Sequence, residues 1–193
     1  QGVASETIAV SIGDDKSQDV LRTAMAMGID RSILAKTDQL LEPLAVAKVL
    51  KSIVENEKPD LVLLGKQAID DDANQTGQLL SALLNWPQGC FISKLKIENN
   101  LLSISREIDE GIENLELTIP AILTCDLRLN TPRFASLPNI MKAKKKTLDV
   151  IDIGELGIDT TPKIKTIKVI EPPTRKAGIM VSDVKELIQK LKY

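Results

Sequence analysis

Residues 61–78 contain the side chains of this sequence best suited to bind a small ligand. The apolar run at residues 61–64 is typical of a strand buried on both faces, and Gly65 ends it. Aspartates and an asparagine follow, and from Thr76 onward leucines recur at helical spacing. The sequence therefore predicts a strand, a loop and a helix. In open α/β sheets this junction binds ligands, because the strand's carboxyl end and the helix's free amides face one crevice.

Two motifs are excluded in this loop. A Walker-type phosphate loop needs a glycine where Asp60 stands, and a calcium loop needs a glycine and a glutamate where Gln75 and Ser81 stand. What remains is a site for a nucleotide phosphate, with the backbone amides of residues 74–76 and the Thr76 hydroxyl as donors. The aspartates must then point elsewhere. The alternative is an acidic surface loop that merely connects two elements.

The composition excludes several other chemistries. Histidine is absent from the 193 residues, which removes the commonest general base and metal ligand, so neither a metal site nor a catalytic residue is predicted. Cys90 and Cys125 lack CxxC spacing and are expected to be reduced core thiols in an intracellular compartment. A net charge of −2 and the lack of an apolar run near ~20 residues argue against nucleic-acid binding and membrane insertion.

The first half of the chain alternates between the strand and helix patterns. Residues 7–11 and 32–35 are expected to be strands. Between them, a helix capped by Ser17 ends at Gly28, and Pro43 begins a second helix. The βαβαβα order predicts a parallel sheet with helices on both faces.

After residue 87 the pattern changes to alternation. It predicts an antiparallel meander with strands at residues 91–97, 101–107 and 115–119 and turns at residues 99–100 and 109–111, followed by a core strand at residues 121–124.

A second chemically distinctive stretch begins at Ser136, which can cap a short helix with Pro138 in its first turn. Leu137 and its apolar neighbours precede a cluster of lysines. An exposed apolar anchor ringed by positive charge suits transient docking of an acidic partner. Lysines also suit the C-terminal end of a helix because of its dipole, so a purely structural role is the alternative.

Three motifs, GKQAIDDDANQTGQ, ISREIDEG and LPNIMKAKKK, closely resemble those of electron transfer flavoprotein beta subunits, and the resemblance extends over nearly the whole chain. It implies an α/β fold, namely a three-layer, doubly wound, mostly parallel sheet of the Rossmann-like, adenine-nucleotide-binding type, with an antiparallel meander and an extended C-terminal arm. It also implies a structural AMP bound by the first strand end and the loop, at Ile12, Gly65, Lys66, Gln67, Ala68, Ile69, Asp70, Asp71, Asp72, Ala73, Asn74, Gln75 and Thr76.

The resemblance assigns roles to two further segments. The recognition loop, in which Leu137 would insert into a hydrophobic pocket on acyl-CoA dehydrogenases, corresponds to Leu137, Pro138, Asn139, Ile140, Met141, Lys142, Ala143, Lys144, Lys145 and Lys146. Lys142 and Lys145 match methylated positions of the family. At the hairpin, Arg106 or Glu107 would form an ion pair with the mobile flavin domain, although a solvated hairpin tip is the alternative.

The function implied by the resemblance is that of an electron carrier rather than an enzyme. The chain would pair with an alpha subunit that holds most of the FAD, and electrons would pass to electron transfer flavoprotein-ubiquinone oxidoreductase. The expected location is the mitochondrial matrix or, for a bacterial relative, the cytoplasm. An ATP-dependent ligase and a nucleotide-binding sensor on the same fold are the alternatives.

Two domains are expected. Residues 1–146 would form the nucleotide-binding domain without its first strand and helix, because family members carry both before the position of Thr7. This absence indicates truncation, with an incomplete AMP pocket and a weakened flavin contact as the alternative, and it would leave an exposed sheet edge. Residues 147–193 would form an arm, with a final helix at residues 182–191, that embraces the alpha subunit. A disordered tail is the alternative.

Overall fold

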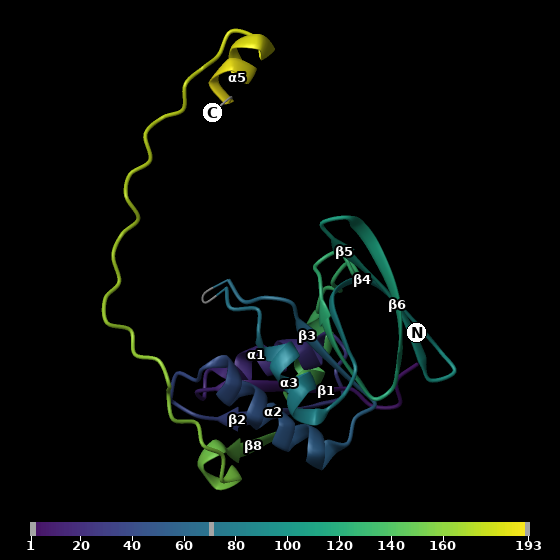
Figure 1. The fold of residues 1–193 in the computed structure, drawn as a ribbon. Coiled ribbons are helices and arrows are strands. Elements are labelled where there is room, and N and C mark those ends of the chain that lie inside the picture. Colours follow the sequence, from purple (N-terminus) through teal and green to yellow (C-terminus); the bar gives the residue numbers. More distant parts are fainter. Residues whose placement is uncertain (1–2, 70–71, 192–193) are drawn as a thin grey trace. The chain divides into compact units, whose positions relative to one another are not determined.

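The computed structural model describes residues 3–69 and 72–191, so Asp70 and Asp71 lie outside the described residues. Its contacts divide the chain into two compact units, Gln1–Lys163 and Ile164–Tyr193. The first unit contains both sheets and most of the helices (Figure 1). None of the described helices is long and apolar enough to cross a membrane.

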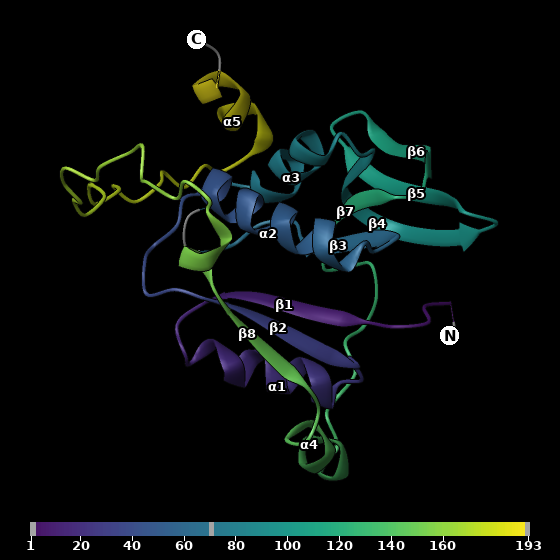
Figure 2. The same ribbon diagram turned by 90° about the horizontal axis from the view of Figure 1, so that it is seen from below.

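The first sheet has three parallel strands in the order β1 (Ile8–Gly13), β2 (Arg31–Lys36) and β8 (Leu148–Asp152). Helix α1 (Ser17–Ala26) covers one face and α2 (Pro43–Glu57) the other (Figure 2). Ile33 of β2 packs against Val49 and Ile53 of α2 in a fully buried cluster. This alternation of helix and strand buries both faces of the sheet.

The second sheet has five strands in the order β3-β7-β4-β5-β6. β3 (Leu61–Gly65), β7 (Ala121–Cys125) and the first part of β4 (Gln88–Glu98) are parallel, whereas β5 (Leu101–Ile108) and β6 (Gly111–Thr118) continue as an antiparallel meander. Helix α3 (Thr76–Leu84) packs Leu80 onto Ile122 of β7 and Ala47 of α2. The helix that begins at the predicted binding loop therefore rests on the core.

The predicted α/β class and the meander are confirmed, but the strands form two sheets instead of one. β3, expected beside the first two strands, pairs with β7 instead. Among the described residues, β1 and β3 each have a single strand neighbour and end their sheets (Figure 2). Hydrophobic periodicity predicts that a segment is a buried strand, but it does not specify which strand lies beside it.

The start of the predicted arm differs from the structure. β8, which lies after residue 146, pairs in parallel with β2, and the following 3-10 helix (Ile153–Leu156) buries Ile153 beside Val49. These residues belong to the first unit, which extends to Lys163. The short, loosely alternating β8 has the pattern of an extended segment, and only its pairing with β2 identifies it as a strand.

Local helix signals were mostly, but not always, correct. Pro43 begins α2, and Ser136 caps α4 (Leu137–Ala143) through its hydroxyl, which accepts from the Asn139 amide at 3.4 Å. The prediction that Ser17 caps α1 was wrong, because Lys16 occupies the cap position and Ser17 is the first residue of the helix. The Asp14 carboxylate instead accepts a hydrogen bond from the Lys16 amide.

In the second unit, α5 (Val184–Leu191) is the only helix among the described residues, and no strand precedes it there. Its apolar side chains are exposed, as are those of residues 164–180: Ile164, Ile167, Val169, Ile170, Ile179, Met180, Val184, Leu187, Ile188 and Leu191. Such a unit buries little apolar surface by itself. That it forms an arm around a partner stays a prediction.

Candidate functional site

A pocket of about 280 Å³ opens where β3 ends and α3 begins. This volume is near the lower limit of the ~300–1,000 Å³ typical of small-ligand sites. The described residues that line it are Leu64, Gly65, Lys66, Gln67, Ala68, Ala73, Asn74, Gln75, Thr76 and Gly77. The predicted junction of strand, loop and helix is thus a concave site.

The pocket is supported by close contact between α3 and β7. A Cβ atom at Gly77 would lie 2.4 Å from Cγ2 of the buried Thr124, so the glycine allows the first turn of the helix to approach the strand. A Cβ at Gly65 would meet nothing within 4 Å, which leaves open space at the strand end. The Gln78 side chain donates to Asn74 Oδ1 at 3.2 Å and ties the loop to the helix.

The loop residues predicted to bind a nucleotide do not all face the pocket. Ile69 is fully exposed, and the Asp72 carboxylate accepts from the side-chain amide of Gln67, so this aspartate is turned toward its own loop. Ile12 packs in the core of the first sheet and is not among the pocket's lining residues. Leu64 and Gly77 line the pocket although they were not predicted. The isolated glycine in the first turn of a helical pattern was the signal for Gly77.

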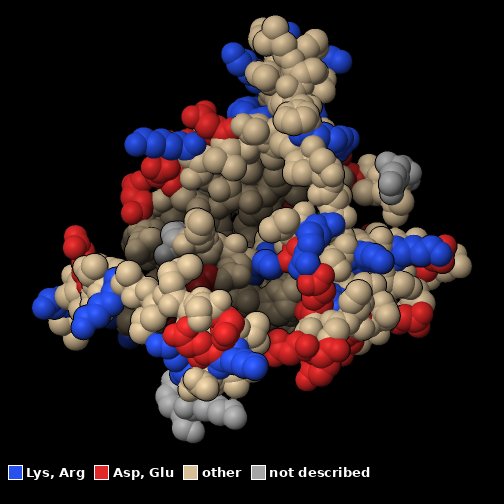
Figure 3. All heavy atoms as spheres, turned by 90° about the horizontal axis from the view of Figure 1, so that it is seen from above, with Lys and Arg blue, Asp and Glu red and all other residues tan. Residues whose placement is uncertain are grey.

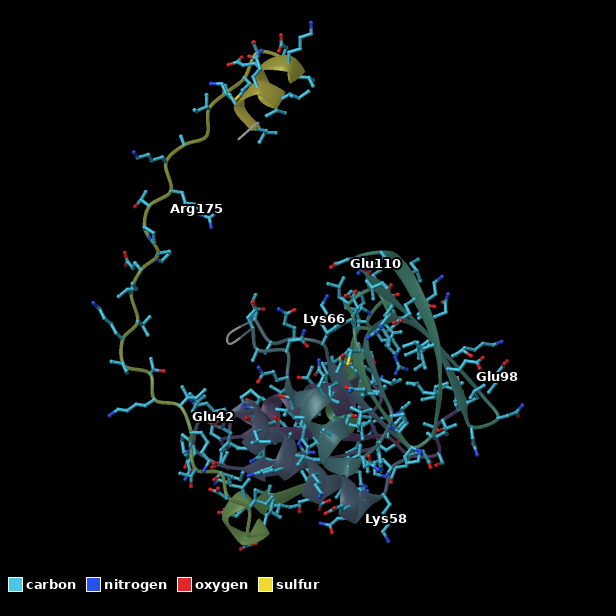
Figure 4. The ribbon with its side chains drawn as sticks, in the orientation of Figure 1. Glu42, Lys58, Lys66, Glu98, Glu110 and Arg175 are labelled. Carbon is cyan, nitrogen blue, oxygen red and sulfur yellow. The ribbon has the colours of Figure 1, made fainter. Side chains whose placement is uncertain are left out.

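Lys66 is the one charged side chain among the described residues that line the pocket. It follows β3 (Figure 4), and its ammonium donates to Asp126 Oδ2 at 2.6 Å. Asp126 follows β7, the neighbour of β3, and its side chain is only 3% exposed. Hydrogen bonds from Arg128 and Lys66 hold the pKa of Asp126 well below its usual range, so this carboxylate is ionised at neutral pH.

The hairpin residues predicted to meet a flavin domain have partners within this chain. Arg106 Nε lies 2.6 Å from Glu113 Oε2, and Glu107 Oε1 accepts from Arg128 at 2.5 Å. The Arg128 and Glu107 side chains are about half exposed. Such pairs exchange partners at low cost, because exposed ion pairs contribute little net free energy.

Helix α4 and the residues around it divide into an inner and an outer set. Ala143 is buried against Met25 of α1, and the Lys146 ammonium donates to the carbonyls of Met25 and Ile29 at the end of α1. The outer set of predicted docking residues is exposed: Leu137, Pro138, Asn139, Ile140, Met141, Lys142, Lys144 and Lys145. Leu137 is 73% exposed.

Two more apolar side chains, both in the segment between β7 and α4, are exposed and were not predicted. Phe134 is 98% and Leu127 is 82% exposed, in the loop that leads from β7 to α4. Phe134 lies three positions before Leu137 in a chain with only 2% aromatic residues, which was the available signal.

Across the face shown in Figure 3, positive and negative side chains are interspersed.

Comparison with known proteins places these features in a family. A family model described as the electron transfer flavoprotein domain matches residues 2–156. The chain belongs to the electron transfer flavoprotein family. The resemblance inferred from the three motifs is thereby confirmed.

The similar relatives in this family are beta subunits. The chain is 53% identical to the electron transfer flavoprotein subunit beta of Bradyrhizobium diazoefficiens over 99% of its own length and 77% of the relative's. It is 52% identical to the mitochondrial beta subunit of Arabidopsis thaliana over 99% of the chain and 77% of the relative. For the beta subunit of Homo sapiens the identity is 53%, over 98% and 76%.

The thiols of this family member are free. Cys90 is buried and Cys125 is partly buried, and burial raises the pKa of both. They are therefore weak nucleophiles at neutral pH. Among the described residues, no group of three or more cysteine, aspartate or glutamate side chains is arranged to hold a metal ion.

Proposed function

We propose that this protein is the beta subunit of a heterodimeric electron transfer flavoprotein and serves as a carrier subunit rather than an enzyme. It binds a structural AMP and an alpha subunit that holds most of the FAD. The observation that carries this proposal is the pocket between β3 and α3, formed by the GKQAIDDDANQTGQ motif in a chain about half identical to beta subunits. FAD supplies the one-electron chemistry when bound.

The pocket suits the phosphate end of a nucleotide. The first turn of α3 has backbone amides without partners inside the helix, and the Thr76 hydroxyl lies beside them. Lys66 contributes a cation to the wall. The open space at Gly65 would let the ligand approach the backbone. Ile12, in β1, does not line this pocket. It would contact AMP only if the bound nucleotide also extends to residues outside the pocket.

Helix α4 is the proposed docking element for acyl-CoA dehydrogenases. Leu137 would enter an apolar pocket on the dehydrogenase, while the exposed lysines attract an acidic rim. Methylation of Lys142 and Lys145 would keep their charge but remove hydrogen-bond donors, and would thereby weaken close docking. Ala143 and Lys146 contact α1, hold α4 in place and take no direct part in docking.

The remaining partners follow from the same assignment. The exposed apolar side chains of residues 164–191 would be covered by the alpha subunit. Glu107 or Arg106 would exchange its internal partner for one on the flavin domain. Electrons would leave through electron transfer flavoprotein-ubiquinone oxidoreductase. The mitochondrial matrix is the proposed location, with the bacterial cytoplasm as the alternative, since relatives from both settings are about equally similar.

Native mass spectrometry of the chain co-expressed with an alpha subunit tests this proposal. A 1:1 heterodimer that releases FAD and AMP on denaturation is the expected result. A monomer or homodimer that releases ATP or no nucleotide would contradict it and favour the sensor or the ligase. A ligase would additionally convert ATP in the presence of an acceptor, for which this pocket has no glycine-rich phosphate loop.

A further inference from the structure

A chain of ion pairs connects the pocket wall to the meander. The Lys66 ammonium donates to Asp126 Oδ2, and the other oxygen of Asp126 accepts from the Arg128 backbone amide at 3.0 Å and from Arg128 Nε at 2.9 Å. The opposite end of the Arg128 guanidinium donates to Glu107. One buried carboxylate therefore joins a cation that lines the pocket to an arginine that does not.

The charges in this series of ion pairs do not contribute equally to the electrostatic attraction of an anion to the pocket. If Lys66 and Asp126 were alone, their opposite charges would cancel at the wall, and an anion would gain little from it. Arg128 adds a second positive charge to the same carboxylate, so these three side chains carry one net positive charge. Glu107 pairs only with the outer end of Arg128, and this outer pair is about half exposed and screened by solvent and salt, whereas Arg128 Nε contacts the buried Asp126 directly.

The backbone around Asp126 holds this arrangement in place. Its amide donates to the carbonyl of Ile92 in β4 at 3.0 Å, and the Lys66 amide donates to the carbonyl of Cys125 at 3.2 Å. Both residues are thus attached to the sheet at the ends of adjacent strands. The long Lys66 side chain has several rotamers, and a fixed carboxylate acceptor selects among them.

We propose that Asp126 and Arg128 are positioning residues for the pocket: Asp126 orients the Lys66 ammonium, and Arg128 offsets the carboxylate so that Lys66 still attracts an anionic ligand. The pocket then prefers a nucleoside monophosphate to the uncharged nucleoside. This inference rests on the proposed function, because it assumes that the pocket binds a nucleotide. A purely structural role for the two residues would instead change the affinities for both ligands equally.

Calorimetric titration of the full chain, freed of nucleotide, with AMP and with adenosine tests the inference. The wild-type protein is expected to bind AMP more tightly. Lys66→Gln removes most of that preference, and Arg128→Gln lowers AMP affinity by about fivefold at low salt, as expected for one partly screened charge. Adenosine affinity is unchanged in both. The Arg128→Gln effect shrinks as salt rises, and Arg128→Lys restores much of the preference.

Lys96→Gln is the matched control, because it removes an exposed cation of the same sheet that pairs with Glu98 and not with Asp126. It should leave AMP affinity unchanged. Asp126→Asn, with its fold checked by thermal melting, should lower AMP affinity through loss of Lys66 orientation. Arg128→Gln replaces a half-exposed side chain and keeps the backbone contact to Asp126, so the test does not depend on the buried variant.

The outcomes separate the two proposals. If the wild-type chain binds AMP and Arg128→Gln leaves that affinity within twofold, or lowers AMP and adenosine affinity alike, the positioning role is wrong while the nucleotide site stands. If the wild-type chain binds AMP and adenosine equally well, the inference is wrong while the nucleotide site stands. If it binds neither ligand, the proposed nucleotide site fails and the inference fails with it.

Discussion

The pocket after β3 and the surface of α4 are both accessible to a ligand, but their side chains are arranged in opposite ways. At the pocket, the one described cation that lines the wall is held by a buried carboxylate, and Leu80 of the adjoining helix is completely buried. On α4, Leu137 is largely exposed and the outer lysines extend into solvent. A site for a small ligand depends on buried residues that hold its wall in place, whereas a site for a protein depends on the side chains that remain exposed.

The two leucines make the comparison measurable, because the same substitution should lower stability strongly at one position and hardly at all at the other. Leu80→Ala removes a fully buried side chain between α3 and β7 and should lower the free energy of unfolding by about 2–5 kcal/mol. Leu137→Ala should change it by less than about 0.5 kcal/mol, because the side chain is exposed. Urea denaturation of both variants measures the difference. Similar losses of stability would mean that α4 is part of the core.

Two glycines at opposite ends of the binding loop should respond differently to substitution by alanine. Gly77→Ala should destabilise the fold by about 1–3 kcal/mol, because the new Cβ meets Thr124. Thr124 cannot rotate freely, since its hydroxyl accepts from the Phe91 amide at 2.9 Å. Gly65→Ala is the control, with open space around its Cβ and a midpoint of thermal unfolding close to that of the wild-type protein. An unchanged midpoint for Gly77→Ala would show that the helix can move away from β7.

The lysines after α4 should separate into a structural and an exposed class. Lys146→Gln should cost about 1 kcal/mol of stability, because the ammonium donates to carbonyls at the end of α1. Lys145→Gln should leave stability unchanged and slow association with an acidic dehydrogenase, with an effect that salt suppresses. Stopped-flow association rates and urea midpoints of the same two variants test this division. Equal stability of both variants would contradict the structural role of Lys146.

The smallest expected effect is the pH dependence of the stability that the Asp126 carboxylate contributes. Because the pKa of Asp126 is lower in the folded chain than its unfolded value near ~3.9, the unfolded chain binds more protons in acid and stability falls as pH decreases. Wild-type protein should therefore exceed Asp126→Asn in stability by a constant margin at pH 5–8, and this margin should shrink below about pH 4. Melting temperatures across this range measure it. A margin that does not change in acid would mean that the ionised carboxylate contributes nothing.

Local features of this protein were accessible from the sequence. The apolar run before Gly65, the cap at Ser136 and the helix start at Pro43 each depend on a few neighbouring residues, and the structure contains all three. That residues 74–76 lie at the pocket followed from the same local pattern. Short-range propensities and helix caps act within one or two turns, which is why a single sequence contains enough information to predict them.

The tertiary structure decided which residues act together. Asp126 and Arg128 lie about sixty positions from Lys66 in the chain, and they reach it only because β3 and β7 are adjacent strands. The division of strands into two sheets depends on the same pairing. Whether Lys146 supports a neighbouring helix or extends into solvent also depends on long-range packing. Such contacts arise from the competition of all surfaces in the folded chain, and no local pattern of residue types encodes their outcome.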